Sequence, residues 1–280
     1  MRYSRKIAQS ISDHRYQSAK TIFDEIKHGH TPSENLLSDL FPPDLVKIVK
    51  DDLELFFANN SLPNKKVRQH IDTAPTEISD ARSKAEKMPS FQALHSALLT
   101  RRKPDELIVK EFYGEYADFA QLVFEMFRSY KMFRKCGLPS AAHLNRVGAI
   151  SSIININDPG SKLYSAIAVG HDLIEDMLYK AVDEFGVHYG FDRYDEFIHQ
   201  FIPEELREGI AILTNHYDLI IKYVIEFLDE RGVGINNGTI LYALETLMTS
   251  EHQLLSKYAG RTLEVLKGLP AETKDLEVIR

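Results

Sequence analysis

Residues 166–176 of the chain read AIAVGHDLIED, an apolar run followed by four ionisable side chains. Positions four apart lie one above the other on a helix, so His171 and Glu175 share one stripe. Asp172 and Asp176 share the neighbouring stripe by the same spacing. The pattern predicts a helix that buries an apolar side and collects imidazole and carboxylate groups on one face.

Turn signals bound this helix. It is expected to begin after residues 158–160, which read DPG, with Ser161 as its cap, and to reach about Lys180. Upstream, Ser140 is the expected cap of a helix that carries His143 one turn into its length. The two chemically loaded segments are therefore predicted to be consecutive helices.

A long helix is predicted before them, over residues 104–135. Proline suits a first helical turn, whereas Gly137 and Pro139 end the helix by opposite backbone constraints. Cys136, which follows this helix, is the only cysteine, so the chain has no internal disulfide framework and no multi-cysteine metal site. We expect Cys136 to be a small core or helix-end residue.

Helical spacing of apolar residues continues almost throughout the chain, and no alternating strand pattern interrupts it. The predicted fold class is all-α. Polar residues dominate positions 61–89, which indicates a surface connection or a weakly packed helix. A boundary near residue 105 then divides a helical N-terminal accessory region, residues 1–104, from a second domain, residues 105–280.

Composition limits the partners of the chain. A hydrophobic content of 44% is sufficient for a packed core, and no apolar stretch is long enough to cross a bilayer. The first residues also lack the apolar core of a signal peptide, so a cytoplasmic protein is expected. A net charge of −7 argues against a broad nucleic-acid surface, and the basic clusters at residues 65–66 and 101–103 are expected to be solvated loops.

Imidazole and carboxylate groups on one helix face suit a divalent transition metal such as manganese, iron or zinc. Such an ion lowers the pKa of water and neutralises phosphate charge, so the implied reaction is hydrolysis of a phosphoester or pyrophosphate. Two ordinary interpretations remain open for these residues. An acidic helix face is commonly a solvated face, and a histidine after an apolar run is commonly a satisfied core residue.

The same residues resemble the HD superfamily and, more narrowly, the hydrolase domain of RelA/SpoT-type alarmone enzymes. Residues 134–143, RKCGLPSAAH, resemble the arginine, glycine-proline turn and first metal histidine of these hydrolases. Residues 171–176, HDLIED, match their His-Asp-x-x-Glu-Asp helix without a gap. The resemblance covers about residues 125–280 and implies an HD-domain-like helical bundle preceded by the accessory region.

The resemblance also implies roles for individual residues. The metal ligands, to manganese by preference, would be His143, His171 and Asp172. Glu175 and Asp176 would position or deprotonate the attacking water. The substrate-binding residues would be Arg134, facing the nucleotide base, and its neighbour Lys135.

This sequence departs from the family in several places. Ser140 stands where an aromatic residue is usual, and Leu144 where a proline commonly follows the first histidine. The family's fourth ligand, an aspartate, has no intact equivalent, since the nearest match places Gly260 there. A second register at residues 274–280 would end just short of that ligand. An insertion at residues 179–193 is expected to form a substrate-side loop.

Three functions are compatible with these features. The leading one is a metal-dependent phosphohydrolase, specifically a guanosine 3′-diphosphate 5′-(di)phosphate pyrophosphohydrolase whose partner is a phosphorylated guanine nucleotide. The second is a degenerate HD domain that binds a nucleotide or a protein without hydrolysis. The third is an HD hydrolase of ordinary nucleotides. No nucleic-acid or membrane partner is expected, and the oligomeric state stays open.

Overall fold

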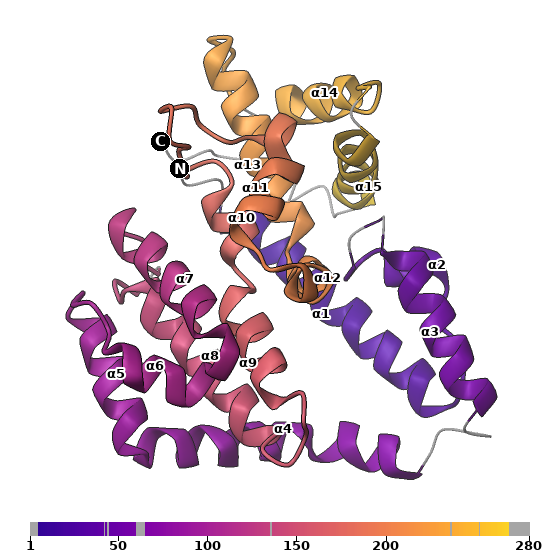
Figure 1. Ribbon diagram of the computed structural model, residues 1–280. Helices are drawn as coiled ribbons and strands as arrows, with labels where there is room; N and C mark the ends of the chain where they lie inside the picture. Colours follow the sequence, from indigo (N-terminus) through magenta and orange to yellow (C-terminus); the bar gives the residue numbers. More distant parts are fainter. Residues whose placement is uncertain are drawn as a thin grey trace. The chain divides into compact units, whose positions relative to one another are not determined.

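The computed structural model of the chain is a set of helices joined by turns (Figure 1). It describes residues 5–41, 43, 45–59, 65–134, 136–235, 237–251 and 253–268. The described residues form no strand, only the isolated bridges Phe133↔Pro139 and Val182↔His188. The all-α fold class is therefore confirmed. None of the helices in these ranges is both long and apolar enough to traverse a membrane.

The chain divides into two compact units. Unit 1 combines Met1–Ile71 with Asn215–Arg280, and unit 2 is Asp72–Thr214. The expected boundary near residue 105 lies inside unit 2, because α5 (Pro89–Leu99) packs against α8 (Ser140–Ile154). Tertiary packing of this kind joins segments that composition alone separates.

Unit 2 contains all the predicted site residues that the structure describes. Besides α5 and α8, its helices are α6 (Glu106–Tyr113), η1 (Gly114–Tyr116), α7 (Ala117–Ser129), α9 (Ser161–Gly170), α10 (Leu173–Met177), η2 (Phe191–Arg193), α11 (Tyr194–Phe201) and α12 (Glu204–Leu213). The helix α4 (Lys65–Lys87) runs from unit 1 into unit 2, so the polar stretch at residues 61–89 is largely helical.

The pair α8 and α9 forms the centre of unit 2. Gly148 permits their close approach, since a Cβ added there would lie 2.7 Å from Val169 Cγ2 and 2.8 Å from the Tyr113 hydroxyl. That hydroxyl donates a hydrogen bond of 3.2 Å to Asn145 Oδ1, and both residues are buried. The two helices are thus held at a separation that only a glycine at position 148 allows.

The long helix predicted over residues 104–135 is wrong in two respects. It breaks at Gly114, whose φ of 57° lies in the left-handed region and closes α6 before α7 begins. It also ends at Ser129 rather than at residue 135. Cys136 then lies exposed in the turn that follows, neither in the core nor at a helix end.

Two further boundaries differ from the prediction. Pro139 is the N-cap of α8, and Ser140 is its buried first residue rather than its cap. The helix predicted from Ser161 to Lys180 begins at Ser161, with Gly160 as its N-cap, but ends at Gly170. A turn separates it from α10, and two of the candidate ligands, His171 and Asp172, lie in that turn.

Unit 1 contains α1 (Arg5–Lys27), α2 (Glu34–Leu37), α3 (Val46–Asn59), α13 (His216–Glu230), α14 (Asn237–Leu247) and α15 (Gln253–Gly268). Buried Ile22, Leu37 and Val46 join the first three helices. Asp39, at the end of α2, accepts a hydrogen bond of 2.7 Å from Ser18 and forms an ion pair with Arg261 of α15. This ion pair ties the N-terminal and C-terminal segments of the unit together.

Candidate metal centre

His143, His171 and Asp172 come together in unit 2. Their candidate ligand atoms all lie within 4.8 Å of one another. The imidazole rings of His143 and His171 meet edge to face, with centroids 5.5 Å apart. No second group of three or more histidine, cysteine or acidic residues with this proximity occurs in the part of the chain that the structure describes.

The site forms because α9 ends where it does. Gly170 packs so tightly that an added Cβ would lie 2.5 Å from Ile210 Cδ1 and 2.9 Å from Phe119 Cζ. His171 and Asp172 then form a turn, with Asp172 at φ −93° and ψ 0°. The sequence predicted one continuous helix through these residues, whereas the turn places both side chains beside the first turn of α8.

A backbone hydrogen bond orients His171. Its Nδ1 donates to the carbonyl oxygen of Ala168 at 2.7 Å, which leaves Nε2 facing Asp172 Oδ1 at 2.9 Å. A second-shell hydrogen bond of this kind selects the tautomer and ring orientation that a metal-binding histidine needs. Nε2 is therefore the nitrogen of His171 that is available as a ligand.

The two partners of this contact shift each other's pKa. Burial alone would lower the pKa of His171, but the hydrogen bond to Asp172 and the charge of that carboxylate raise it above the ordinary value. Burial alone would raise the pKa of Asp172, but the hydrogen bond and charge of His171 lower it. Without an ion, a proton on Nε2 holds the pair together, and metal binding at Nε2 requires the loss of that proton.

His143 presents a neutral imidazole. Burial, and then the charge of Arg134, lower its pKa to about 4, so at neutral pH the ring is uncharged and one of its two nitrogens has a free lone pair for an ion. Two imidazoles and one carboxylate form a donor set that suits a divalent transition metal and leaves positions for water and substrate oxygen. The residues present thus fit the predicted ion.

Glu175 and Asp176 continue from the turn into α10. Both are half-buried, and the amide of Asp176 donates to the carbonyl oxygen of Asp172 at 3.0 Å. The charge of Glu175 contributes to raising the pKa of His171, which places this carboxylate close to the ligand cluster. The two predicted catalytic acids therefore lie on the helix that begins at the candidate metal centre.

Arg134 lies in the loop between α7 and α8. Its amide donates to the carbonyl oxygen of Leu138 at 2.9 Å, and its guanidinium Nη1 lies 4.0 Å from Asp172 Oδ2. The side chain is 44% exposed, so it borders the cluster from the solvent side. Its predicted contact with a nucleotide base stays a prediction. Lys135, the other predicted substrate-binding residue, lies outside the described residues.

Arg146 is a neighbour of the site that the sequence did not single out. It lies one turn beyond His143 on α8, with Nη2 3.4 Å from His95 Nε2 and Nε 3.9 Å from Glu86 Oε1. Its charge contributes to lowering the pKa of His143. The spacing of three residues from His143 could have indicated it, but the partners from α4 and α5 could not be found from spacing.

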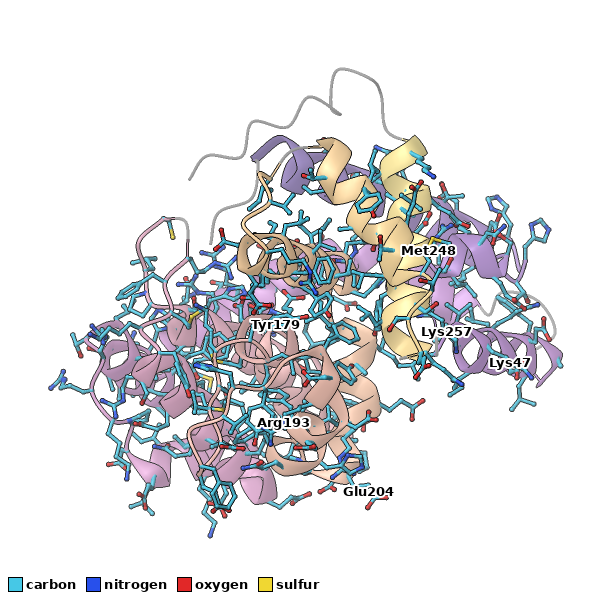
Figure 2. All side chains as sticks on the ribbon, turned by 90° about the horizontal axis from the view of Figure 1, so that it is seen from above. Lys47, Tyr179, Arg193, Glu204, Met248 and Lys257 are labelled. Atoms are coloured by element: carbon cyan, nitrogen blue, oxygen red, sulfur yellow. The ribbon has the colours of Figure 1, made fainter. Side chains whose placement is uncertain are left out.

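The position matched to the fourth ligand lies in the other unit. Gly260 is part of α15 in unit 1, where Met248, labelled in Figure 2, packs 3.7 Å from the place that a Cβ at position 260 would take. The second register, at residues 274–280, lies outside the described residues. Within the ranges that are described, the cluster thus has three ligands.

The insertion at residues 179–193 forms an ordered loop. Asp183 Oδ1 accepts hydrogen bonds from the amides of Phe185 and Val187, both at 2.9 Å, and its Oδ2 pairs with Arg193 at 2.9 Å. His188 is exposed on this loop. Its role on the substrate side stays a prediction.

Comparisons with known proteins identified no relative of the chain. No protein-family model, no curated protein and no solved structure matches the chain. The resemblance to HD hydrolases therefore rests on the motif residues alone.

Proposed function

We propose that the chain is a metal-dependent phosphohydrolase of the HD type that acts on a phosphorylated nucleotide. One observation carries the proposal: His143 of α8 and His171 and Asp172 of the turn after α9 bring their ligand atoms within 4.8 Å of one another. Three ligands of this kind with open positions are typical of a catalytic rather than a closed structural site.

The residues around the ligands have distinct parts in the proposed reaction. A divalent ion held by these ligands would polarise a phosphate oxygen and lower the pKa of a water molecule. Glu175 and Asp176 would position the attacking water, and one of these two carboxylates would accept its proton. The hydrogen bond from His171 to the Ala168 carbonyl keeps the imidazole in the ligand tautomer throughout.

The proposed substrate is a guanosine 3′-diphosphate 5′-(di)phosphate in the cytoplasm. Positive charge on both sides of the cluster supports a phosphorylated substrate, since Arg134 lies 4.0 Å from Asp172 and Arg146 lies one turn from His143. The choice of guanosine comes from the resemblance of residues 134–143 and 171–176 to alarmone hydrolases.

The proposal is tested by the metal content of the purified protein, together with manganese-dependent release of pyrophosphate from guanosine tetraphosphate. We expect a tightly bound ion and release of pyrophosphate, both lost in His171→Ala. The matched control is His199→Ala, which removes an exposed histidine of α11 in the same unit, outside the cluster and outside the loop at residues 179–193. Equal activity in His171→Ala and the wild type would refute the proposed site.

A degenerate HD domain that binds its ligand without hydrolysis is the second candidate. It is favoured by Gly260, which stands at the position matched to the family's fourth ligand and has no side-chain ligand atom. Calorimetry with guanosine tetraphosphate separates the candidates: nucleotide binding without bound metal or product supports the second. A panel of ordinary nucleoside mono- and triphosphates in the same assay identifies a hydrolase of different specificity.

A further inference from the structure

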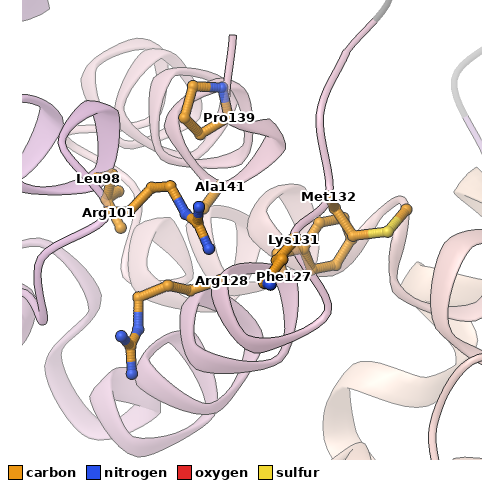
Figure 3. A pocket seen from close by; sticks show the side chains of 8 residues that line it. All are labelled: Leu98, Arg101, Phe127, Arg128, Lys131, Met132, Pro139 and Ala141. Atoms are coloured by element: carbon orange, nitrogen blue, oxygen red, sulfur yellow. The ribbon is translucent and has the colours of Figure 1, made fainter. Parts of the chain in front are cut away.

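A small pocket lies in unit 2 at the end of α5 and α7 and the start of α8 (Figure 3). It is a hollow that opens to solvent, and the space in and in front of it amounts to about 250 Å³, open solvent included. Its walls are apolar and three cations border them, as the full lining shows: Leu98, Arg101, Phe127, Arg128, Lys131, Met132, Pro139 and Ala141. None of the candidate metal ligands lines it.

Two basic segments that are far apart in the sequence meet at this pocket. Arg101, from the basic cluster at residues 101–103, follows α5, and Lys131 follows α7, so tertiary packing brings the two cations to one pocket. The Arg101 guanidinium lies 5.6 Å from the ring centroid of Phe133, in the loop after Lys131. In Figure 3 the Arg101 side chain extends toward Ala141.

The charges of Arg101 and Lys131 are not compensated. Arg128 is neutralised by Glu125, whose Oε2 accepts a hydrogen bond of 3.0 Å from the Arg128 Nε. Arg101 and Lys131 form neither an ion pair nor a side-chain hydrogen bond with any residue that the structure describes. Two like charges at one pocket repel each other unless an anion lies between them.

Both cations occupy helix-terminal positions that glycine usually takes. Arg101 has φ 58° and Lys131 has φ 52°. The two helices end with the same kind of backbone hydrogen bond. At the end of α5 the amide of Arg102 donates to the carbonyl oxygen of Ala97 at 2.8 Å, and at the end of α7 the amide of Met132 donates to that of Phe127 at 2.9 Å. Glycine would adopt this backbone conformation with less strain. The backbone conformation therefore does not explain why positively charged residues occupy these two positions.

We propose that this pocket is an anion-binding site for the phosphate group of a small phosphorylated molecule, held between Arg101 and Lys131. A phosphate monoester carries a charge close to −2 at neutral pH, which balances the two uncompensated cations. The N-cap Pro139 and the first-turn residue Ala141 of α8 line the pocket, so the positive end of this helix favours the same ligand.

The test is calorimetric titration of the full chain with inorganic phosphate in the presence of a metal chelator, so that the candidate metal centre plays no part. The variant is Arg101→Gly with Lys131→Gly, which suits the left-handed backbone and should keep the fold. We expect saturable binding by the wild type and a loss of at least about tenfold in affinity for the double variant.

The matched control is Lys84→Gln with Lys110→Gln, which removes two exposed positive charges elsewhere in unit 2. This control should bind phosphate within about twofold of the wild type, because the ionic contribution is local at physiological ionic strength. Equal weakening in both double variants, or no saturable binding by the wild type, overturns the site. Equally tight binding of succinate overturns the assignment to phosphate.

The bound phosphate group could belong to either of two ligands. One is a nucleotide that also reaches the candidate metal centre, and the other is a separate phosphorylated molecule that binds only at the pocket. Titration of the manganese-loaded protein with guanosine 5′-monophosphate distinguishes them when the glycine variant is combined with His171→Ala. Non-additive losses in affinity indicate one ligand that spans both sites. Additive losses, or no effect of His171→Ala, indicate a separate ligand of the pocket and support the site independently of the proposed hydrolase.

Discussion

The carboxylates of Glu175 and Asp176 are the groups on which the proposed proton transfer depends. Replacing both, as Glu175→Gln with Asp176→Asn, should lower pyrophosphate release by about 100- to 10,000-fold. The helical content should be unchanged, because both side chains are only half-buried and the amides are close in volume to the acids. Steady-state kinetics measure the rate of pyrophosphate release, and circular dichroism measures the helical content.

The result of that experiment also tests the site against its ordinary interpretation. If Glu175 and Asp176 belong only to a solvated helix face, the double variant should retain the turnover of the wild type. A loss of turnover with bound metal retained places the defect in proton transfer, because the three ligands are untouched.

His143 should titrate well below an ordinary histidine in the metal-free protein. Its pKa is lowered to about 4 by burial and next by the charge of Arg134. Arg134→Gln should therefore raise this pKa part of the way toward the ordinary value of 6.5, and burial should keep it from reaching that value. Imidazole chemical shifts followed by NMR against pH measure the change.

The control for this titration is Lys110→Gln, which removes an exposed charge that is not among the groups acting on His143. An unchanged pKa in Arg134→Gln would mean that the guanidinium does not face the cluster, contrary to its distance of 4.0 Å from Asp172.

At the scale of secondary-structure elements, the close packing of α8 and α9 supports the site, because His143 lies on one helix and His171 directly follows the other. Gly148→Ala should destabilise the protein by about 1–3 kcal/mol through overpacking. The added methyl would lie 2.7 Å from Val169 Cγ2 and 2.8 Å from the Tyr113 hydroxyl, and neither is the end of a long flexible side chain. Urea denaturation measures the free energy of unfolding.

Gly234→Ala is the comparison for this change, because nothing lies within 4 Å of a Cβ added there and its φ is not left-handed. It should leave the free energy of unfolding nearly unaltered. Equal stability of the two alanine variants would show that α8 and α9 lie further apart than described.

The element boundaries show where local sequence signals were sufficient. Gly160 and Ser161 start α9 as the turn signal indicated, because a change from turn to helix depends on neighbouring residues. The break after Gly170 was not predicted, because it depends on Ile210 and Phe119 from other helices. Gly114 was inside a region of uninterrupted helical periodicity, and only its left-handed backbone ends α6.

At the scale of the whole chain, unit 1 depends on a contact between its two distant segments. Asp39 is 8% exposed in its side chain, and its ion pair with Arg261 joins residues 222 positions apart. Asp39→Asn should lower the stability of the protein by about 1–3 kcal/mol at neutral pH, because it removes the buried one of the two carboxylates that pair with Arg261 and leaves only the exposed Glu264. Thermal or chemical denaturation measures the loss.

This contribution should depend on pH in a defined direction. Burial alone would raise the pKa of Asp39, but hydrogen bonds from His14 and Ser18 and the charge of Arg261 lower it below 3.8. A depressed carboxyl pKa stabilises the folded state above the unfolded value and ceases to do so as the pH falls through the folded value. The difference between wild type and Asp39→Asn should therefore shrink below about pH 4, and a constant difference would contradict the assignment.

Local patterns in the sequence were enough for the helical fold class and for the grouping of imidazole and carboxylate side chains in residues 171–176, since periodicity, turn residues and side-chain chemistry belong to neighbouring positions. Tertiary structure alone decided that His143 meets His171 and that residues 215–280 pack with the N-terminal segment. It also brought Arg101 and Lys131 to one pocket. These are contacts between residues far apart in the chain, and they depend on how helices fill a common core rather than on any spacing along it.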